Sequence, residues 1–465
     1  MSFKYITEQI TPNHYVLPKT GDMRCDVHAF VSEQLFQLSE EACWLQARNA
    51  ACYPGVTDVY LMPDTHSGYG VPIGSVVVTE DTIIQAVNGY DISCGVVNIR
   101  FPDLNASHIA SWDKREKLVK EIEKRATFGL GSGRPELIEN YSSKDVDEMF
   151  RFGAKVIGVD AELCERQFIP VKGDLFKIDK AYDKSINQLG SIGSGNHYCE
   201  IQCDKDTGEV WAMIHCGSRG YGYQTADYFF HKAAELRGFA KNQREQSWLR
   251  IDEPLGKEYW NHMAACANYA IANRHIIVRG VMGAMKKVFK SEGEIYYEIS
   301  HNLTQEETIV LPDGTTKKGF VHRKGATRAF PAGHPDLVGS KWAETGHPCL
   351  VPGSMYDGAA VLFPKEGAYK SGCSVNHGSG RLLGRKEAKR KLKDKQGFID
   401  DQMKNVKRKL GGTIVKGIVT NSRKTPLDEC SHVYKNLDKV LDVLEAEDIA
   451  EVKHRLYPVC NLKGQ

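Results

Sequence analysis

The sequence predicts a mixed α+β protein, because helical and strand-like segments alternate without a repeating βαβ unit. Residues 105–126 place charged side chains on one side and apolar side chains on the other, as an amphipathic helix does. Residues 72–79 and 295–299 are short apolar runs typical of strands, and residues 223–290 are mostly helical. No internal repeat, low-complexity linker or clean domain boundary interrupts the chain.

The other expected elements follow in chain order. Ser32 is expected to cap a helix over residues 32–51, and an apolar strand near residues 59–62 opens into a glycine-rich loop. The remaining expectations are a strand near 15–18, a helix over 143–157, a strand over 210–214, a hairpin around 312–314, a helix over 385–395 and a final helical region over 433–457.

The composition is that of an ordinary globular protein. The 465 residues are 41% hydrophobic and 26% charged, and a net charge of +2 gives no overall attraction to nucleic acid or membranes. The 13 cysteines form no Cys-x-x-Cys pair, which argues against a disulfide framework and for a reducing compartment. Because no leader pattern and no membrane-length apolar run is present, we expect a cytoplasmic protein without membrane contact.

The segment from Gly89 to Val96 carries an acid and a thiol, Asp91 and Cys94, between glycines. Asp offers a hard oxygen ligand, and a Cys thiolate offers a soft sulfur that can bridge two cations. The segment therefore suggests half of a metal site. Taken alone, it equally fits a turn with a buried, inert cysteine.

Three histidines, His197, His215 and His301, each adjoin an expected strand next to small or polar residues. With Asp91 and Cys94 they suffice for two neighbouring divalent ions, if Cys94 bridges them. Such mixed ligation suits Mn, Zn, Fe or Co better than Ca, and open positions would serve catalysis. A structural or surface role is expected for the histidines in ordinary surroundings, namely His14, His28, His108, His231, His262, His275 and His454.

Two glycine-rich loops could bring backbone N–H groups close to a phosphate, and a third loop is a weaker candidate for the same role. They are residues 193–196, 377–381 and 352–355, and none matches a nucleotide-binding fingerprint, so ordinary turns stay an alternative. His377, between glycines and before Arg381, could act as a nucleophile toward phosphorus. The basic run over 385–395 reads as a solvated helix face, or as a polyanion groove if it faces the site.

These motifs resemble the RtcB family of RNA ligases, and the resemblance covers most of the chain. The segment from Gly89 to Val96 is similar to the family's Gly-Phe-Asp-Ile-Asn-Cys-Gly-Val. The other matching motifs occur in the family's order and are residues 62–70, 189–200, 215–220, 300–302, 322–330, 352–355, 376–381 and 463–464.

The resemblance implies one large compact catalytic domain over residues 1–465 with a central two-metal cleft, in which 223–290 would be a helical elaboration. It implies GTP-dependent joining of an RNA end bearing a 3′-phosphate or 2′,3′-cyclic phosphate to a 5′-hydroxyl end, with two Mn²⁺ ions. His377 would bind GMP covalently and transfer the GMP to the RNA 3′-phosphate. The 5′-hydroxyl would then displace the GMP. Repair or tRNA splicing would be its role, and an activating protein partner is a further expectation.

The resemblance also implies residue roles. One ion would be held by Asp91, Cys94 and His197, and the other by Cys94, His215 and His301. Asp64 lies in a motif that the family needs, and a role in opening the cyclic phosphate is our hypothesis. The guanylate site would comprise Asn196, His197, Tyr198, Cys199, Glu200, His301, Asn302, Pro352, Gly353, Ser354, Met355, His377, Gly378, Ser379, Gly380 and Lys463.

The sequence departs from the family pattern at a few positions. Ala359 stands where a serine usually contacts the nucleotide, Asn376 where Cys is common before the nucleophile, and Ser93 where Asn is usual. Tyr356-Asp357 is an unusual pair after Met355. Nucleotide preference and RNA-end preference are therefore open, and a diverged paralogue serving repair is one reading.

Two other functions are compatible with parts of the pattern. A metal-dependent RNA-end phosphatase or cyclic phosphodiesterase would use the metals without sealing. A non-catalytic RNA-binding subunit would have no use for five aligned metal-type ligands, which argues against it.

Overall fold

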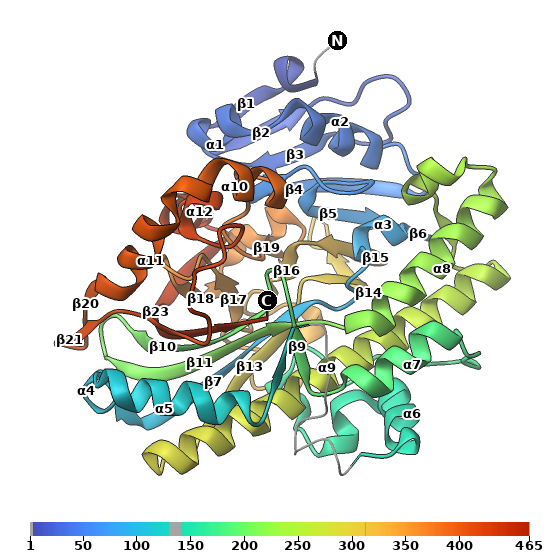
Figure 1. Ribbon diagram of the computed structural model, residues 1–465. Helices are drawn as coiled ribbons and strands as arrows, with labels where there is room; N and C mark the ends of the chain where they lie inside the picture. The colour runs from blue at the N-terminus through green and yellow to red at the C-terminus, as the bar shows by residue number, and fades with distance from the viewer. Residues whose placement is uncertain (1–2, 130–140, 312, 465) are drawn as a thin grey trace.

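Two large sheets organise the part of the chain that the computed structural model describes, which is residues 3–129, 141–311 and 313–464 (Figure 1). Helices pack on both sheets, which confirms the predicted mixed α+β architecture. Within these residues, no helix combines the length and apolar character that crossing a membrane requires.

The first sheet has seven strands and contains the N-terminal region. Neighbouring strands are antiparallel except β3 and β4, which are parallel. In sheet order, the strands are β1 (Glu8–Thr11), β2 (His14–Leu17), β3 (Val27–Phe30), β4 (Val56–His66), β5 (Ile73–Thr79), β15 (Thr316–Lys324) and β14 (Asn302–Val310). The expected strands near 15–18 and 72–79 are thus confirmed, and the β14–β15 hairpin is present, although residue 312 lies outside the described residues.

Two expectations for this region need correction. The expected helix over 32–51 is two helices, α1 (Glu33–Leu38) and α2 (Glu41–Ala50), because Ser39 is extended with φ −70° and ψ 139°. Ser32 does cap α1, accepting a hydrogen bond from the Leu35 amide. The apolar strand near 59–62 continues to His66, so Asp64 belongs to a strand and not to a loop.

The second sheet has eight strands and carries most of the candidate site. In sheet order they are β13 (Glu294–Ser300), β7 (Gly95–Asn105), β11 (Glu209–Cys216), β10 (Tyr198–Asp204), β23 (Ala450–Lys463), β18 (Ala359–Pro364) and β17 (Cys349–Pro352), with β22 (Val419–Thr420) paired to β23. The expected strands over 210–214 and 295–299 are confirmed as β11 and β13.

The expected helical region over 433–457 is wrong in its second half. Helix α12 covers only Leu437–Ala446. Strand β23 begins at Ala450 and lies between β10 and β18 in the sheet. The charged side chains of Glu451, Lys453 and Arg455 alternate with less polar ones, which is the period of a strand. Pairing on both edges of this segment outweighs its local helical preference.

Helix α9 (Pro254–Phe289) is the longest helix described, with 36 residues, and its middle is buried on nearly all sides. It runs beneath the second sheet in Figure 1 and contacts β7, β9 (Ser191–Gly193) and β11. Helix α8 (Arg219–Arg237) packs against it and ends at Gly238, whose φ of +72° is the left-handed conformation that glycine favours. The helical content expected over 223–290 is confirmed, while its status as an elaboration of one domain stays a prediction.

The other helices are shorter than the sequence suggested. The region over 105–126 divides into α4 (Ala106–Ile109) and α5 (Trp112–Glu123), and the region over 143–157 is α6 (Ser143–Phe152) followed by a 3₁₀ turn. The remaining elements are α3 (Gln85–Asn88), α7 (Asp179–Gln188), α10 (Arg385–Leu392), α11 (Gln396–Asn405), β6 (Thr82–Ile83), β8 (Thr127–Phe128), β12 (Leu249–Arg250), β16 (Ala326–Arg328), β19 (Ser374–Asn376), β20 (Lys407–Leu410) and β21 (Thr413–Lys416).

Candidate active site

Neighbouring strands of the second sheet bring the predicted metal-type side chains to one end of the sheet. His215 lies opposite Val96 of β7 on one side and opposite Tyr198 of β10 on the other, and Ser300 lies opposite Gly95. The loop with Asp91 and Cys94, the residue before β10 and the residue after β13 therefore converge on His215. Residues 91, 94, 197, 215 and 301, spread over 211 positions of sequence, meet because of this strand order.

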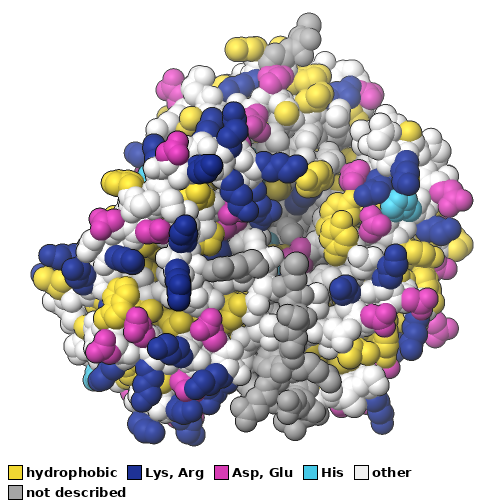
Figure 2. All heavy atoms as spheres, in the orientation of Figure 1, with side chains coloured by type: hydrophobic (Ala, Val, Ile, Leu, Met, Phe, Trp, Pro, Cys, Tyr) yellow, Lys and Arg dark blue, Asp and Glu magenta, His cyan; other side chains and the backbone are white. Residues whose placement is uncertain are grey.

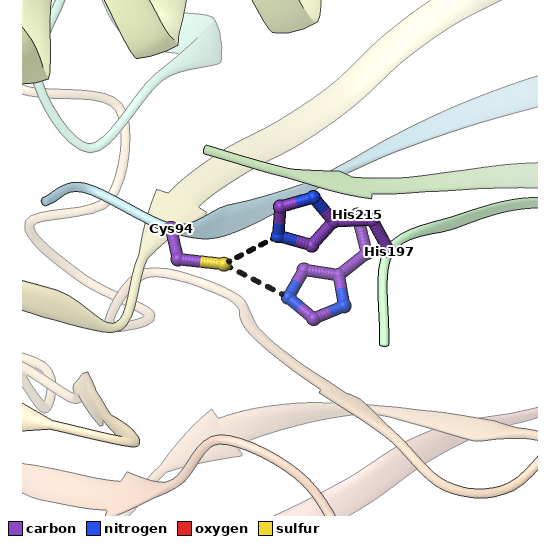
Figure 3. Close-up of side chains that lie close together, drawn as sticks. All are labelled: Cys94, His197 and His215. Atoms are coloured by element: carbon purple, nitrogen blue, oxygen red, sulfur yellow. Dashed lines mark hydrogen bonds between the residues drawn. The ribbon is translucent and has the colours of Figure 1, made fainter. Parts of the chain in front are cut away.

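The side chains of this cluster are within ligand-sharing distance. The Cys94 Sγ lies 3.4 Å from His197 Nε2 and 3.2 Å from His215 Nε2, and Figure 3 shows the sulfur pointing between the two rings. His301 Nε2 is 3.3 Å from His215 Nε2, and Asp91 Oδ2 is 2.9 Å from His197 Nε2. Cys94, His197 and His215 are buried together and could hold one ion.

The hydrogen-bonding of His197 is compatible with a cation in this cluster. Its Nδ1 lies 2.9 Å from the Ile192 carbonyl oxygen, which can only accept, so Nδ1 carries the proton. In the neutral imidazole, Nε2 then presents a lone pair to the Asp91 carboxylate. Either a proton on Nε2, which pairs His197 with Asp91 as an ion pair, or a metal ion satisfies this 2.9 Å contact.

The protonation states of the other members also suit metal ligation. Burial, reinforced by neighbouring histidines, holds the pKa of both His215 and His301 well below the ordinary value, so their nitrogens keep free lone pairs. Burial and the nearby Asp91 raise the pKa of the Cys94 thiol, so a thiolate there needs a cation to stabilise it. The donor set therefore fits divalent metal ions.

A buried arginine that the sequence analysis missed braces the loops of this cluster. Arg274, in the middle of α9, donates from Nη1 to the backbone carbonyls of Ser93 and Cys216 at 2.6 and 2.9 Å. Its Nη2 donates to Ser300 Oγ at 3.3 Å and pairs with Glu298. One guanidinium thus contacts the neighbours of Cys94, His215 and His301, and no local motif marks it.

His377 lies beside this cluster, at the end of β19. Its Nδ1 is 2.6 Å from Oδ2 of the fully buried Asp64, and its ring centroid is 4.9 Å from that of His301. A Cβ at Gly325, which has φ +61°, would lie 2.9 Å from the His377 ring, so glycine there leaves room for the imidazole. With Nδ1 engaged by Asp64, Nε2 is the nitrogen available to react.

A cavity of about 180 Å³ opens on one side of His377. Most of the predicted guanylate residues line it, namely Asn196, Tyr198, Glu200, Pro352, Gly353, Ser354, Met355, His377, Gly378, Ser379, Gly380 and Lys463. Glu200 accepts from Gln202 and Asn461, and burial raises its pKa to about 7. Its two oxygens each retain a lone pair for a ligand.

A second cavity, of about 260 Å³, opens on the metal-type side of His377. Asp91, Cys94, His301 and Asn302 line it, and Asn196 and His377 line both cavities. His197 lines a third, wider groove of about 800 Å³. The predicted residues therefore surround His377 from two directions.

Two positions that the family resemblance connects with the nucleotide, Cys199 and Ala359, do not line the 180 Å³ cavity. Cys199 follows Tyr198 in β10, so its side chain points to the opposite face of the sheet and packs in the core. The Ala359 side chain is buried in another core cluster and is not among the residues that line the cavity.

The other departures from the family pattern have visible local contacts. Ser93 has φ +58°, a conformation that favours Asn or Gly, and its Oγ lies 2.8 Å from Ser300 Oγ. Asn376 donates to the Gly378 carbonyl at 2.6 Å and shapes the loop after His377. Asp357 and Ser354 form a hydrogen-bonded turn at 2.6 Å beside the cavity.

The basic tract over 385–395 contributes Arg385 and Lys389 to the site and exposes other residues. Arg385 Nη2 donates to Asn196 Oδ1 at 3.3 Å, while Lys386 and Arg390 are exposed. Arg385, Lys389 and Lys424 line the wide groove. Figure 2 shows Lys and Arg side chains gathered over the α10 region beside a hollow near the middle of the view.

A buried carboxylate, Glu429, links the basic tract to the C-terminal strand and was also missed. It accepts from Arg381 at 3.2 Å and pairs with Lys463 at 3.3 Å, and both lie at the 180 Å³ cavity. Arg385 reaches the same carboxylate at 3.5 Å. A single Glu in an irregular segment carries no pattern, so no local signal reveals it.

Comparisons with known proteins agree with these features. A family model described as tRNA-splicing ligase RtcB matches residues 46–464. The chain is 35% identical to a tRNA-splicing ligase RtcB of Archaeoglobus fulgidus, over the whole of both chains, and 35% identical to one of Thermococcus kodakarensis, over 95% of each. It is 30% identical to an RNA-splicing ligase RtcB homolog 1 of Entamoeba dispar, over 95% of this chain and 88% of that protein.

Proposed function

The chain belongs to the RtcB family, and from this premise we propose that it joins RNA ends through a covalent guanylate on His377. Family membership makes it an RNA ligase enzyme, and tRNA splicing is the role that the relatives' names carry. One observation carries the proposed chemistry. His377, oriented by Asp64, lies between a cavity of about 180 Å³ and a cluster of metal-type ligands.

Two Mn²⁺ ions are the proposed metals. Asp91, Cys94 and His197 would hold one, and Cys94, His215 and His301 the other. Bound there, the ions would supply positive charge beside the phosphates. The low pKa values of the buried His215 and His301, and a Cys94 Sγ within 3.4 Å of two imidazole nitrogens, support metal ions at this cluster.

GTP is the proposed nucleotide, and Glu200 supports guanine over adenine. A carboxylate on the cavity wall can accept from the N1–H and N2 amino groups of guanine, whereas adenine has no proton on N1. Asp64 and the loop after His377 would leave Nε2 facing the α-phosphate. Lys463, at the same wall, would offset phosphate charge.

The reaction would proceed in three exchanges at phosphorus. His377 Nε2 forms a P–N bond to the α-phosphorus of GTP, and pyrophosphate leaves. The Nδ1 proton stays in place, and the Asp64 carboxylate stabilises the positive charge of the phosphorylated imidazole. An RNA 3′-phosphate oxygen then attacks this phosphorus and releases His377, which makes an RNA–guanylate anhydride.

The last exchange seals the RNA. The 5′-hydroxyl of the other end attacks the RNA phosphorus, GMP leaves, and a phosphodiester remains. A 2′,3′-cyclic phosphate end must first be opened by water to a 3′-phosphate. The wide groove lined by Arg385, Lys389 and Lys424 is the proposed track for the RNA backbone, because cations contact phosphates without reading sequence.

Labelling with GTP that carries a radioactive α-phosphate, in the presence of Mn²⁺, tests the central step. Label should remain on the wild-type chain after denaturation and be absent from His377→Ala, whose matched control is His432→Ala, a surface histidine away from the cavities. If His377→Ala is labelled as well as wild type, the proposal fails. If no label stays and the RNA 3′ end is nevertheless dephosphorylated or opened, the chain is a phosphatase or cyclic phosphodiesterase.

The end preference, the RNA substrate within tRNA splicing or repair, a cytoplasmic location and an activating partner stay predictions. Sealing assays with matched RNAs ending in a 3′-phosphate or a 2′,3′-cyclic phosphate address the first. Equal sealing of both ends is the expected result.

A further inference from the structure

A second sulfur–imidazole–carboxylate cluster lies behind the candidate active site. Cys164 follows a 3₁₀ turn (Ala161–Leu163), His275 comes from the middle of α9, and Glu298 comes from β13. The three side chains are buried, and their donor atoms all lie within 4.8 Å of one another. Cys164 Sγ is 3.3 Å from His275 Nε2, which matches the spacing of Cys94 from its two histidines.

Polar atoms of this second cluster lack partners among the described residues. Glu298 Oε2 accepts no hydrogen bond from any of them, and this is the orphan atom that a cation would satisfy; His275 Nδ1 also lacks a partner, but a metal on Nε2 leaves it so. Glu298 and His275 are each 1% exposed, so water does not replace these bonds at the surface. An unpaired buried carboxylate oxygen is costly, and most such atoms in native proteins find a partner.

We propose that Cys164, His275 and Glu298 hold one zinc-type divalent cation, separate from the pair proposed at Cys94. One sulfur, one nitrogen and one oxygen are donors that Zn²⁺ accepts. On binding, the Cys164 thiol releases its proton to solvent, and the S–H bond is replaced by a sulfur–metal bond. No redox change is involved.

The charges of the cation and its ligands balance. A divalent cation with one thiolate, one carboxylate and a neutral imidazole has no net charge, so the buried Arg274 guanidinium is the one charge left over at the site. Arg274 pairs with Glu298 Oε1, which leaves Oε2 to face the cation. The arginine and the cation can therefore share the carboxylate without competing for one oxygen.

The ion would fasten elements that position the active site. His275 directly follows Arg274, which holds the carbonyls beside Cys94 and His215. Glu298 lies on β13, three residues before His301. A cation joining α9 to β13 would fix the distance between these two supports, so its role is structural.

Metal counting on the full-length chain tests this site. After dialysis against Zn²⁺ and removal of free metal, Cys164→Ser and His275→Gln should each hold one zinc fewer per chain than wild type by mass spectrometry. Cys266→Ser and His262→Gln are matched controls, because both residues are buried on α9 away from the cluster, and they should lose none. Zinc content equal to wild type in Cys164→Ser would overturn the proposal.

Crystals of the wild-type chain soaked in Zn²⁺ cover the case in which the variants do not fold. Anomalous scattering at the zinc edge should show a peak bounded by Cys164, His275 and Glu298. A peak at the Cys94 cluster with none at the second cluster would refute this inference and leave the proposed ligase chemistry untouched.

Discussion

The hydrogen bond between Asp64 and His377 should set the rate at which the chain takes up GMP. Asp64→Asn keeps the shape of the side chain but removes its charge from Nδ1, 2.6 Å away. A hydrogen bond to a charged group contributes about 1.5–3 kcal/mol, and each 1.36 kcal/mol of barrier is a factor of ten. The expected loss is therefore roughly 10- to 150-fold in the rate of labelling from α-labelled GTP, measured in single turnover.

A matched change on the same strand separates this effect from general damage. Asp58→Asn, also in β4 but away from His377, should label at the wild-type rate, and both variants should keep the wild-type metal content. If Asp64→Asn labels as fast as wild type, Asp64 does not orient the nucleophile. Selective failure on RNA with a cyclic phosphate end would then favour a role in opening that end.

Three further changes test other parts of the site. Arg274→Lys keeps a charge near Glu298 but loses the planar fork, so Mn²⁺ affinity should fall roughly 10- to 100-fold in a chelator competition assay. Glu200→Gln should weaken binding of GTP but not of ATP in calorimetry. In wild type, GTP affinity should fall about tenfold per pH unit below pH 7, because burial raises the pKa of Glu200 to about 7 and protonation turns one of its two acceptor oxygens into a donor. Cys94→Ala should abolish labelling of His377, although it removes no atom of the covalent bond.

Each of these has a contrary outcome. Arg279→Lys, on the same helix as Arg274, should leave Mn²⁺ affinity unchanged. An equal loss of Mn²⁺ affinity in this variant would mean that any Arg→Lys change in α9 weakens the site. A pH profile for GTP that is flat in wild type would contradict the role of Glu200. Labelling that persists in Cys94→Ala at saturating Mn²⁺ would show that the two proposed ions do not depend on a shared sulfur.

The sequence predicted the strands of this fold better than its helices. The apolar runs 72–79 and 295–299 correspond to the central strand β5 and the edge strand β13, whose apolar side chains pack into the core. The helix over 32–51 breaks at Ser39, and the segment from Ala450 to Lys463 is a strand because β10 and β18 pair with it. Those partners are distant in sequence, so no local pattern reveals them.

The residues of the candidate site also fall into two groups: those that a local sequence pattern reveals, and those that only the fold brings together. His197, His215 and His301 could be picked out because each adjoins a strand and shares a context of small residues. Arg274 and Glu429 could not, because each acts through carbonyls or charges that only the fold brings near. The family resemblance assigns Cys199 to the guanylate site, but strand alternation places its side chain in the core.

The position of His377 between two cavities bears on how one imidazole could serve both half-reactions. A guanylate on Nε2 would extend into the 180 Å³ cavity, while the RNA phosphate would approach from the side of Cys94 and His301. The two reactants would then meet at the guanylate phosphorus without displacing the nucleotide, because Asn196 and His377 line both cavities. Asp64 holds the imidazole from the buried side, so its ring need not rotate between the two steps.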